Sequence, residues 1–257
     1  MDPSAGATFD AALARAAAFD EALLARPWSY LGRPIDVRYA FYRTVEDAQE
    51  ALMRVAARPH PESRRILALA QRAFGDLRGL LVGLPDDLLD RAPREAEWPL
   101  RETLRHVLLI ERRYATQTRW ATERTAADPI RIGDDRMPTP AQIDVTGSVG
   151  QILTRLGEVR AETNRGLGDL TPAAITRPSA WMGYEVDVRF RLHRFPAHLI
   201  EHTIQCEKTL DALGWRPPEG RYIVRRLASL LGEIEGLGGE SEARDIEREF
   251  VARLAST

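Results

Sequence analysis

Apolar residues recur at steps of three and four over four long segments of the chain, which is the pattern of amphipathic helices. In the first segment Ile66, Ala73 and Leu77 share one stripe, and proline- or glycine-rich stretches separate the segments from one another. We therefore expect four long helices, at about residues 62–83, 99–126, 146–170 and 195–213. No segment alternates between polar and apolar residues for long, so the predicted class is all-α, an antiparallel four-helix bundle.

The two ends of the chain predict additional helices. Residues 8–25 are amphipathic and rich in alanine, and two shorter helices are expected at 223–235 and 240–255. Thr44 is placed as the cap of a helix that runs to about residue 57. Residues 28–42 are rich in aromatic side chains and are expected to form an ordered loop docked on the bundle. The predicted organisation is an N-terminal helical extension (1–60) packed on the bundle, the bundle itself (61–214) and a C-terminal helical extension (215–257).

The sequence also suggests an internal repeat. A helix, a leucine–proline turn, a loop that ends near a tryptophan and a histidine-bearing helix occur twice, about 85 to 92 residues apart, with Trp98 and Trp181 as the tryptophans. This duplication predicts a bundle with approximate two-fold symmetry.

Composition excludes several classes of function. The 257 residues are 44% hydrophobic and 29% charged, which is enough to bury a full core, and the net charge of −2 with mixed signs argues against a nucleic-acid-binding surface. No apolar run reaches the roughly 20 residues needed to cross a bilayer, and the first residues lack a basic flank and an apolar block. The single cysteine, Cys206, excludes an intrachain disulfide framework. We therefore expect a cytoplasmic protein that binds neither nucleic acid nor membrane.

Three of the five histidines point to a metal site. His198 and His202 are four residues apart, so their rings project from the same side of a helix, whose first turn suits Pro196. His106 lies on the broad apolar face of the second long helix. Two imidazoles one turn apart can share a metal ion, and a third from a facing helix completes a ligand set. The alternative is that these are core histidines whose hydrogen bonds are satisfied within the protein.

Two motifs resemble a known family. The stretch from Trp98-Pro99 to His106, followed by His198-x-x-x-His202-x-x-Gln205, is similar to the DinB/YfiT-like superfamily of four-helix-bundle metalloproteins. The resemblance covers about residues 62–214. In that family one histidine of the second bundle helix and two of the fourth hold a divalent ion, which implies His106, His198 and His202 as the ligands here. Members with an assigned activity are thiol-dependent enzymes that use mycothiol, bacillithiol or glutathione.

Three neutral imidazoles suit zinc or nickel and leave one position open for water or substrate, as in catalytic sites. The first hypothesis is therefore a divalent-metal-dependent enzyme, specifically a thiol-dependent transferase of the S-transferase or isomerase type. Two alternatives stay open, a metal-dependent hydrolase and a non-catalytic helical bundle that acts through partner binding. The sequence assigns no catalytic residue.

Substrate-binding candidates lie next to the predicted ligands. Gln205, three residues after His202, is placed to hydrogen-bond a bound ligand, and Arg194 is placed to hold an anionic group, with surface ion pairing as its alternative. Cys206 is interpreted as a buried thiol rather than a ligand. The expected partners are a small-molecule substrate, with a low-molecular-weight thiol as first candidate, and a second copy of the chain in a homodimer.

Overall fold

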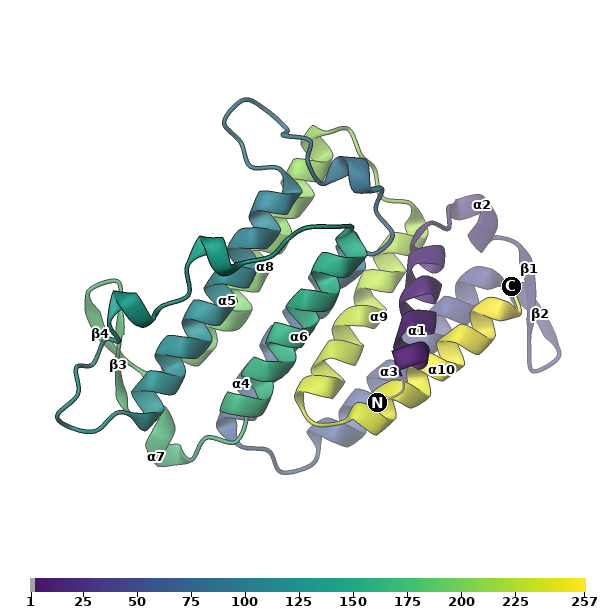
Figure 1. The fold of residues 1–257 in the computed structure, drawn as a ribbon. Helices are drawn as coiled ribbons and strands as arrows, with labels where there is room; N and C mark the ends of the chain where they lie inside the picture. Colours follow the sequence, from purple (N-terminus) through teal and green to yellow (C-terminus); the bar gives the residue numbers. More distant parts are fainter. Residues whose placement is uncertain (1–2) are drawn as a thin grey trace.

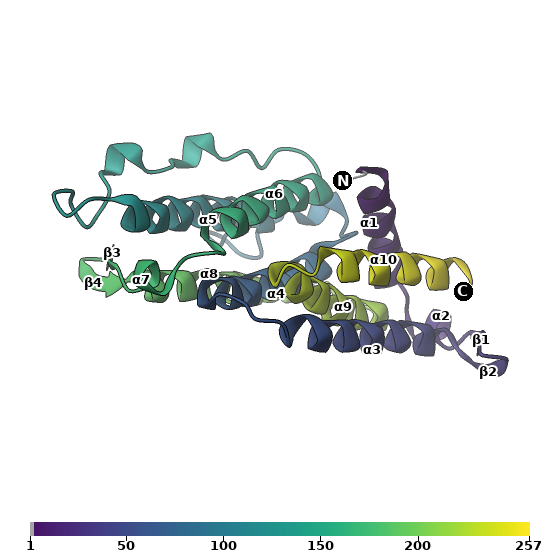
Figure 2. The same ribbon diagram turned by 90° about the horizontal axis from the view of Figure 1, so that it is seen from below.

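The computed structural model describes residues 3–257, and it places two four-helix bundles side by side (Figures 1 and 2). The first bundle consists of the four predicted long helices, so the all-α, four-helix class is confirmed. These helices are α4 (Glu62–Leu81), α5 (Leu100–Glu123), α6 (Val149–Leu167) and α8 (Val188–Ala212). Their apolar stripes form one continuous core, in which Leu77, Leu104 and Leu192 are almost fully buried.

The second bundle is formed by both ends of the chain. Its helices are α1 (Pro3–Ala17), α3 (Val37–Ala56), α9 (Glu219–Gly236) and α10 (Glu240–Ala255). They share a second core, in which the Phe250 ring lies 6.0 Å from that of Phe9 and 5.7 Å from that of Phe41, measured between centroids. The segments predicted as separate N- and C-terminal extensions therefore pack on each other as one unit, because each end alone lacks enough apolar surface to cover its own stripe.

Short elements connect the long helices. They comprise the helices α2 (Glu21–Leu24) and α7 (Pro172–Ile175), the hairpins β1 (Pro27–Tyr30) with β2 (Arg33–Asp36) and β3 (Pro178–Trp181) with β4 (Tyr184–Asp187), and the 3₁₀ turns η1 (Asp86–Leu88), η2 (Asp134–Arg136) and η3 (Pro140–Gln142). Each sheet within residues 3–257 has only two strands.

Two helices of the first bundle run in each direction. α4 and α8 are parallel, and an ion pair between Glu62 and Arg189 (2.5 Å) joins their N-terminal ends. The N–H of Val149, at the start of α6, binds the side chain of Asp86 just after α4, while Ser63 at the start of α4 binds the carbonyl of Gly168 after α6. α6 is therefore antiparallel to α4, and the long connection over residues 124–148 is needed because α5 and α6 begin at the same end of the bundle (Figure 1).

The two hairpins reveal a duplication. Both begin with Arg-Pro, turn at a glycine preceded by an exposed apolar residue, and end with Asp-Val-Arg. The strands pair in the same register, since Pro27 lies opposite Asp36 and Pro178 lies opposite Asp187. Equivalent residues are 151 positions apart.

The helices that follow the hairpins are also equivalent. Asp36 and Asp187 cap α3 and α8 in the same way, each accepting a hydrogen bond from a backbone N–H of the first turn. Arg38 pairs with Glu219 at the start of α9 (2.6 Å), just as Arg189 pairs with Glu62 at the start of α4. The element order from α1 to α5 is thus repeated from α6 to α10.

Each bundle takes two helices from each copy. The first combines α4 and α5 with α6 and α8, and the second combines α9 and α10 with α1 and α3. The repeat predicted at 85 to 92 residues is not the one that the fold shows, because Trp181 lies in a β-hairpin whereas Trp98 lies in an irregular segment directly before α5.

Glycines allow the two bundles to touch. α4 and α9 pack closely and antiparallel, and a Cβ added at Gly75 would lie 2.1 Å from the carbonyl oxygen of Ala228. A Cβ at Gly232, which corresponds to Gly75 in the other copy, would lie 2.4 Å from the carbonyl oxygen of Gln71. Only a residue without a side chain permits this approach of two backbones.

Several local predictions are corrected by the hairpins. α8 begins at Val188 rather than at 195, so Pro196 lies inside the helix instead of in its first turn, and Arg194 is helical. The cap from Asp187 and the preceding hairpin set this start, and the bundle tolerates a proline within the helix. Residues 28–42 form hairpin β1–β2 and the start of α3 rather than a loop, and Thr44 lies buried within α3, where its hydroxyl donates to the Ala40 carbonyl.

None of the helices within residues 3–257 combines the length and the hydropathy required to cross a membrane.

Candidate metal centre

The three predicted histidines converge where α5 and α8 pack against each other. His106 projects from α5, and His198 and His202 project from successive turns of α8. Each offers a ring nitrogen, and these nitrogens all lie within 4.8 Å of one another. The Nε2 atoms of His198 and His106 are 3.2 Å apart. Three ring nitrogens around one point are a donor set that can hold a divalent metal ion.

Burial keeps the imidazoles of His198 and His106 in the form that binds metals. His198 is only 6% exposed. Burial, followed by the charges of the neighbouring histidines and Arg194, lowers the pKa of His198 to about 3, and burial likewise lowers the pKa of His106. Both rings are therefore neutral at pH 7, with a lone pair available for coordination.

Gln205 orients one of the histidines. Its Oε1 atom lies 2.7 Å from Nδ1 of His202. With the amide oxygen as acceptor, Nδ1 carries the proton and Nε2 keeps the lone pair, which fixes both the tautomer and the ring plane. Gln205 thus contacts a candidate metal ligand, His202. The assignment of Gln205 as a substrate-binding residue stays a prediction.

Replacing Gln205 by alanine is expected to weaken metal affinity about 10- to 100-fold, because His202 loses the partner that holds its ring. Isothermal titration of the metal-free protein with Zn²⁺ measures the change. Gln205→Glu is the matched variant and should retain the affinity, since its carboxylate still accepts from Nδ1. Equal affinities for Gln205→Ala and the wild type would show that the ring needs no such support.

Aromatic side chains surround the triad, and sequence reasoning missed their role. The Tyr114 ring lies edge-on to His198 at 5.5 Å, and the half-exposed Trp98 lies 5.4 Å from His106, between centroids. Tyr114 follows His106 by two helical turns, so the sequence places both residues on one face of the helix. The same spacing is equally typical of core packing, so it does not by itself indicate a role at the site. These rings give the site an apolar side beside His106 and His198.

Cys206 is separate from the ligand group. Its side chain is fully buried, and burial raises the pKa of its thiol to about 12, so it stays protonated at neutral pH. This location agrees with its interpretation as a packed thiol.

The second bundle has no equivalent histidines. The residues 151 positions before His198 and His202 are Asp47 and Ala51. Asp47 pairs with Arg253 of α10 at 2.7 Å, and Ala51 is buried in the core. The histidine group therefore belongs to the first bundle alone within residues 3–257.

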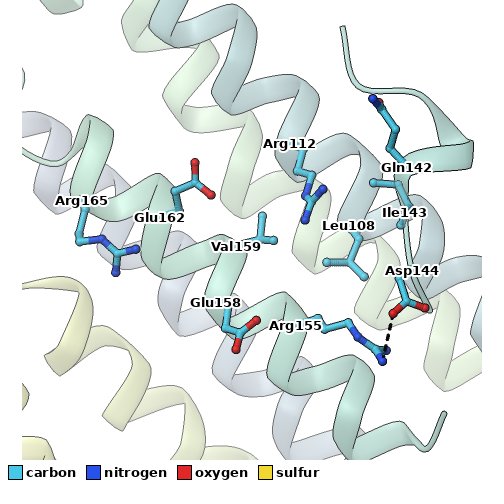
Figure 3. Close-up of a pocket in the computed structure, with 10 residues that line it drawn as sticks. All are labelled: Leu108, Arg112, Gln142, Ile143, Asp144, Arg155, Glu158, Val159, Glu162 and Arg165. Carbon is cyan, nitrogen blue, oxygen red and sulfur yellow. Dashed lines mark ion pairs between the residues drawn. The ribbon is translucent and has the colours of Figure 1, made fainter. Parts of the chain in front are cut away.

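A pocket of about 320 Å³ lies elsewhere on the first bundle, between α5, α6 and the loop that contains η3 (Figure 3). Its lining mixes both charges, and Asp144 and Arg155 form an ion pair of 3.2 Å across it. None of the three histidines lines this pocket. The pocket is therefore separate from the candidate metal centre, and the charges of its lining largely compensate one another.

Comparison with known proteins agrees with this geometry. The sequence matches the DinB superfamily over residues 69–206, which is more than half of the chain and includes all three histidines. The protein therefore belongs to the DinB superfamily. No curated protein matches the sequence.

One similar solved structure is YfiT from Bacillus subtilis, described as a probable metal-dependent hydrolase with an unusual four-helix bundle topology. It shares 14% identity and a TM-score of 0.42 with this chain, and the match covers 62% of this chain and 94% of YfiT.

Proposed function

We propose that this protein is a divalent-metal-dependent enzyme in which His106, His198 and His202 hold the ion and a small-molecule substrate occupies the remaining position. The observation that carries the proposal is the convergence of three ring nitrogens within 4.8 Å, on two helices that pack against each other. The membership in the DinB superfamily supports it further.

The donor set fits zinc or nickel. Both accept neutral imidazole, and three protein ligands leave a position for a substrate. Because the ligands are uncharged, a bound ion would keep its full positive charge and supply Lewis acidity that lowers the pKa of a thiol or water at the open position.

The protein's own residues supply the rest of the site. Gln205 fixes the ring of His202, while Trp98 and Tyr114 form apolar walls beside His106 and His198. These walls reduce the local dielectric response, which strengthens the interaction of any charged substrate group with the centre.

A low-molecular-weight thiol is the substrate that we propose, and a thiol-dependent transferase is the reaction class. The support for the thiol is the family resemblance of the His106 and His198-x-x-x-His202 motifs. A metal-dependent hydrolase would use the same three histidines and would turn over without a thiol. A non-catalytic bundle would keep its fold on loss of the ion and bind no thiol.

Proton release on thiol binding tests this proposal. An unperturbed cysteine thiol has a pKa near 8.5 and is protonated at pH 7, so capture as the thiolate releases about one proton. Calorimetry of the Zn²⁺-loaded protein with glutathione, in two buffers of different ionisation enthalpy, measures the proton count. The experiment is repeated with mycothiol and bacillithiol.

The metal-free protein is the control and should bind none of the three thiols. Binding that is absent from the loaded protein, or that persists unchanged without metal, would reject the transferase. A hydrolysis screen of the loaded protein without thiol would then separate the hydrolase from the non-catalytic bundle.

A further inference from the structure

Two arginines beside the histidine triad have no acidic partner in the described part of the chain. Arg191 and Arg194 lie in the first two turns of α8, and Arg191 is only 5% exposed. Arg191 donates from Nη1 to the Ala180 carbonyl at 2.9 Å, and the Nε atoms of both arginines lack a partner. The Ser179 hydroxyl, fully buried in the same hairpin, is also unpartnered. A buried guanidinium without a counter-ion is costly unless a ligand supplies one.

In two other buried arginines the terminal nitrogens meet a carboxylate or several backbone carbonyls. Arg160 pairs with Glu111 at 2.5 Å, and Arg221 donates to backbone carbonyls at the C-terminal end of α4, including that of Leu80 at 3.1 Å. The Nε atoms of Arg160 and Arg221 are also unpartnered. What distinguishes Arg191 and Arg194 is that neither guanidinium meets a carboxylate or a set of carbonyls within the described residues, because Arg191 donates to one backbone carbonyl and Arg194 to the Tyr114 hydroxyl. Burial lowers the pKa of Arg191 to about 10, and the side chain is still a cation at pH 7.

The duplicated bundle provides an internal comparison. Arg43 of α3 corresponds to Arg194, and it is surrounded by acidic residues of its own helix: Glu46 at 2.5 Å, Asp47, and Glu50 at 3.5 Å. An arginine at this position is thus compensated in the bundle without histidines.

In the first bundle most of that compensation is gone. Two of the three acidic positions have become Ala197 and His198, and the third is Glu201, which forms no ion pair with Arg194. The buried Arg191 adds a second cation where the other copy has Ala40. At this pair of corresponding positions, Arg194 and Arg43, the arginine without an acidic partner is therefore the one in the bundle that carries the metal ligands.

Aromatic rings connect the arginines to the triad. The Arg194 guanidinium carbon lies 4.8 Å from the Trp181 ring centroid, and that of Arg191 lies 5.3 Å from Trp181 and 5.4 Å from Tyr114. Tyr114 in turn contacts His198. Tyr114 thus lies between Arg191 and the candidate metal centre, and Trp181, which packs on Tyr114, connects Arg194 to the same group. One small molecule can span the distance from the two cations to the triad.

We propose that Arg191 and Arg194 bind an oxyanion, the carboxylate or phosphate end of the substrate, while its reacting end lies at the triad. Guanidinium groups recognise such anions through paired N–H donors. The link to the reacting end rests on the proposed function, but the anion site itself does not require the metal.

Calorimetry of the metal-free protein tests the anion site. Sodium succinate and sodium phosphate are titrated separately at pH 7, with ionic strength held constant by sodium chloride. We expect saturable one-to-one binding of at least one anion. The anion that binds more tightly indicates whether the anionic group of the substrate is a carboxylate or a phosphate. Arg194→Gln should weaken this binding at least tenfold. Arg43→Gln, the same change at the corresponding position of the second bundle, should leave it unchanged.

Arg191 is tested with two variants because it is buried. Arg191→Met should abolish binding, and Arg191→Lys, which keeps the charge without the paired donors, should weaken it; circular dichroism verifies that each is folded. The absence of saturable binding to both anions, or equal affinity in Arg194→Gln and the wild type, would overturn the proposal. Anion binding without thiol binding would retain this site and reject the thiol-dependent function.

Discussion

Replacing His202 by alanine is expected to abolish metal binding. The loss in affinity should be well above the roughly 100-fold that results from removing a residue, such as Gln205, that only hydrogen-bonds a ligand. His202 supplies one of only three nitrogens in the group, and the remaining His106 and His198 make a two-ligand site. Dialysis against Zn²⁺ followed by elemental analysis should show one ion per wild-type chain and none for the variant. Far-UV circular dichroism should be unchanged, because the other core contacts of α8 remain.

His193→Ala is the matched control. It removes an exposed imidazole from the same helix and lies outside the ligand group, so it should leave the metal content at one ion per chain. A His202→Ala variant that retains wild-type affinity would mean that another set of residues binds the ion.

The second large effect concerns the contact between the two bundles. Gly75→Ala is expected to lower the free energy of unfolding by about 2 to 3 kcal/mol, although alanine favours a helix over glycine by about 1 kcal/mol. The added methyl would lie 2.1 Å from the Ala228 carbonyl oxygen and 2.7 Å from its carbon. These are backbone atoms of α9, so relief requires the two bundles to separate slightly and lose packing along the whole contact.

Gly157→Ala is the control for helix propensity. Gly157 lies within α6, and a Cβ there would meet only the Phe74 ring at 3.6 Å, which is an ordinary contact. This variant should gain about 0.5 to 1 kcal/mol. Urea unfolding measures both changes. A Gly75→Ala variant as stable as the wild type would show that α4 and α9 pack less closely than the structure has them.

The duplication gives the second bundle an interpretable role. Helix α9 of the second bundle covers the face of α4 that carries small residues. At the position that corresponds to His198, the second bundle has Asp47, which pairs with Arg253. The two bundles are related like the subunits of a homodimer with an isologous contact. The first bundle, to which both copies contribute, carries the histidines, and the second bundle supports it.

Local patterns were sufficient for most of the first bundle. The apolar stripes located α4, α5, α6 and the later part of α8, because a helix of a packed bundle must repeat its buried face every 3.6 residues. The spacing of His198 and His202 placed two ring nitrogens on one side of a helix for the same reason. Membership in the DinB superfamily was also recognisable from short motifs around the three histidines.

Contacts between residues distant in the sequence decided the rest. Pro196 has the features of a helix start, and only the β3–β4 hairpin with its Asp187 cap moves that start back to Val188. The helices at the two ends of the chain form one core. No local sequence pattern predicts which apolar helix face packs against which other one. Whether Arg194 is a surface ion pair or an uncompensated cation depends on which carboxylates face it, and that is set by packing. The sequence by itself therefore determined the helices and the ligand pair, while the tertiary structure decided the pairing of the two copies and the charge beside the metal centre.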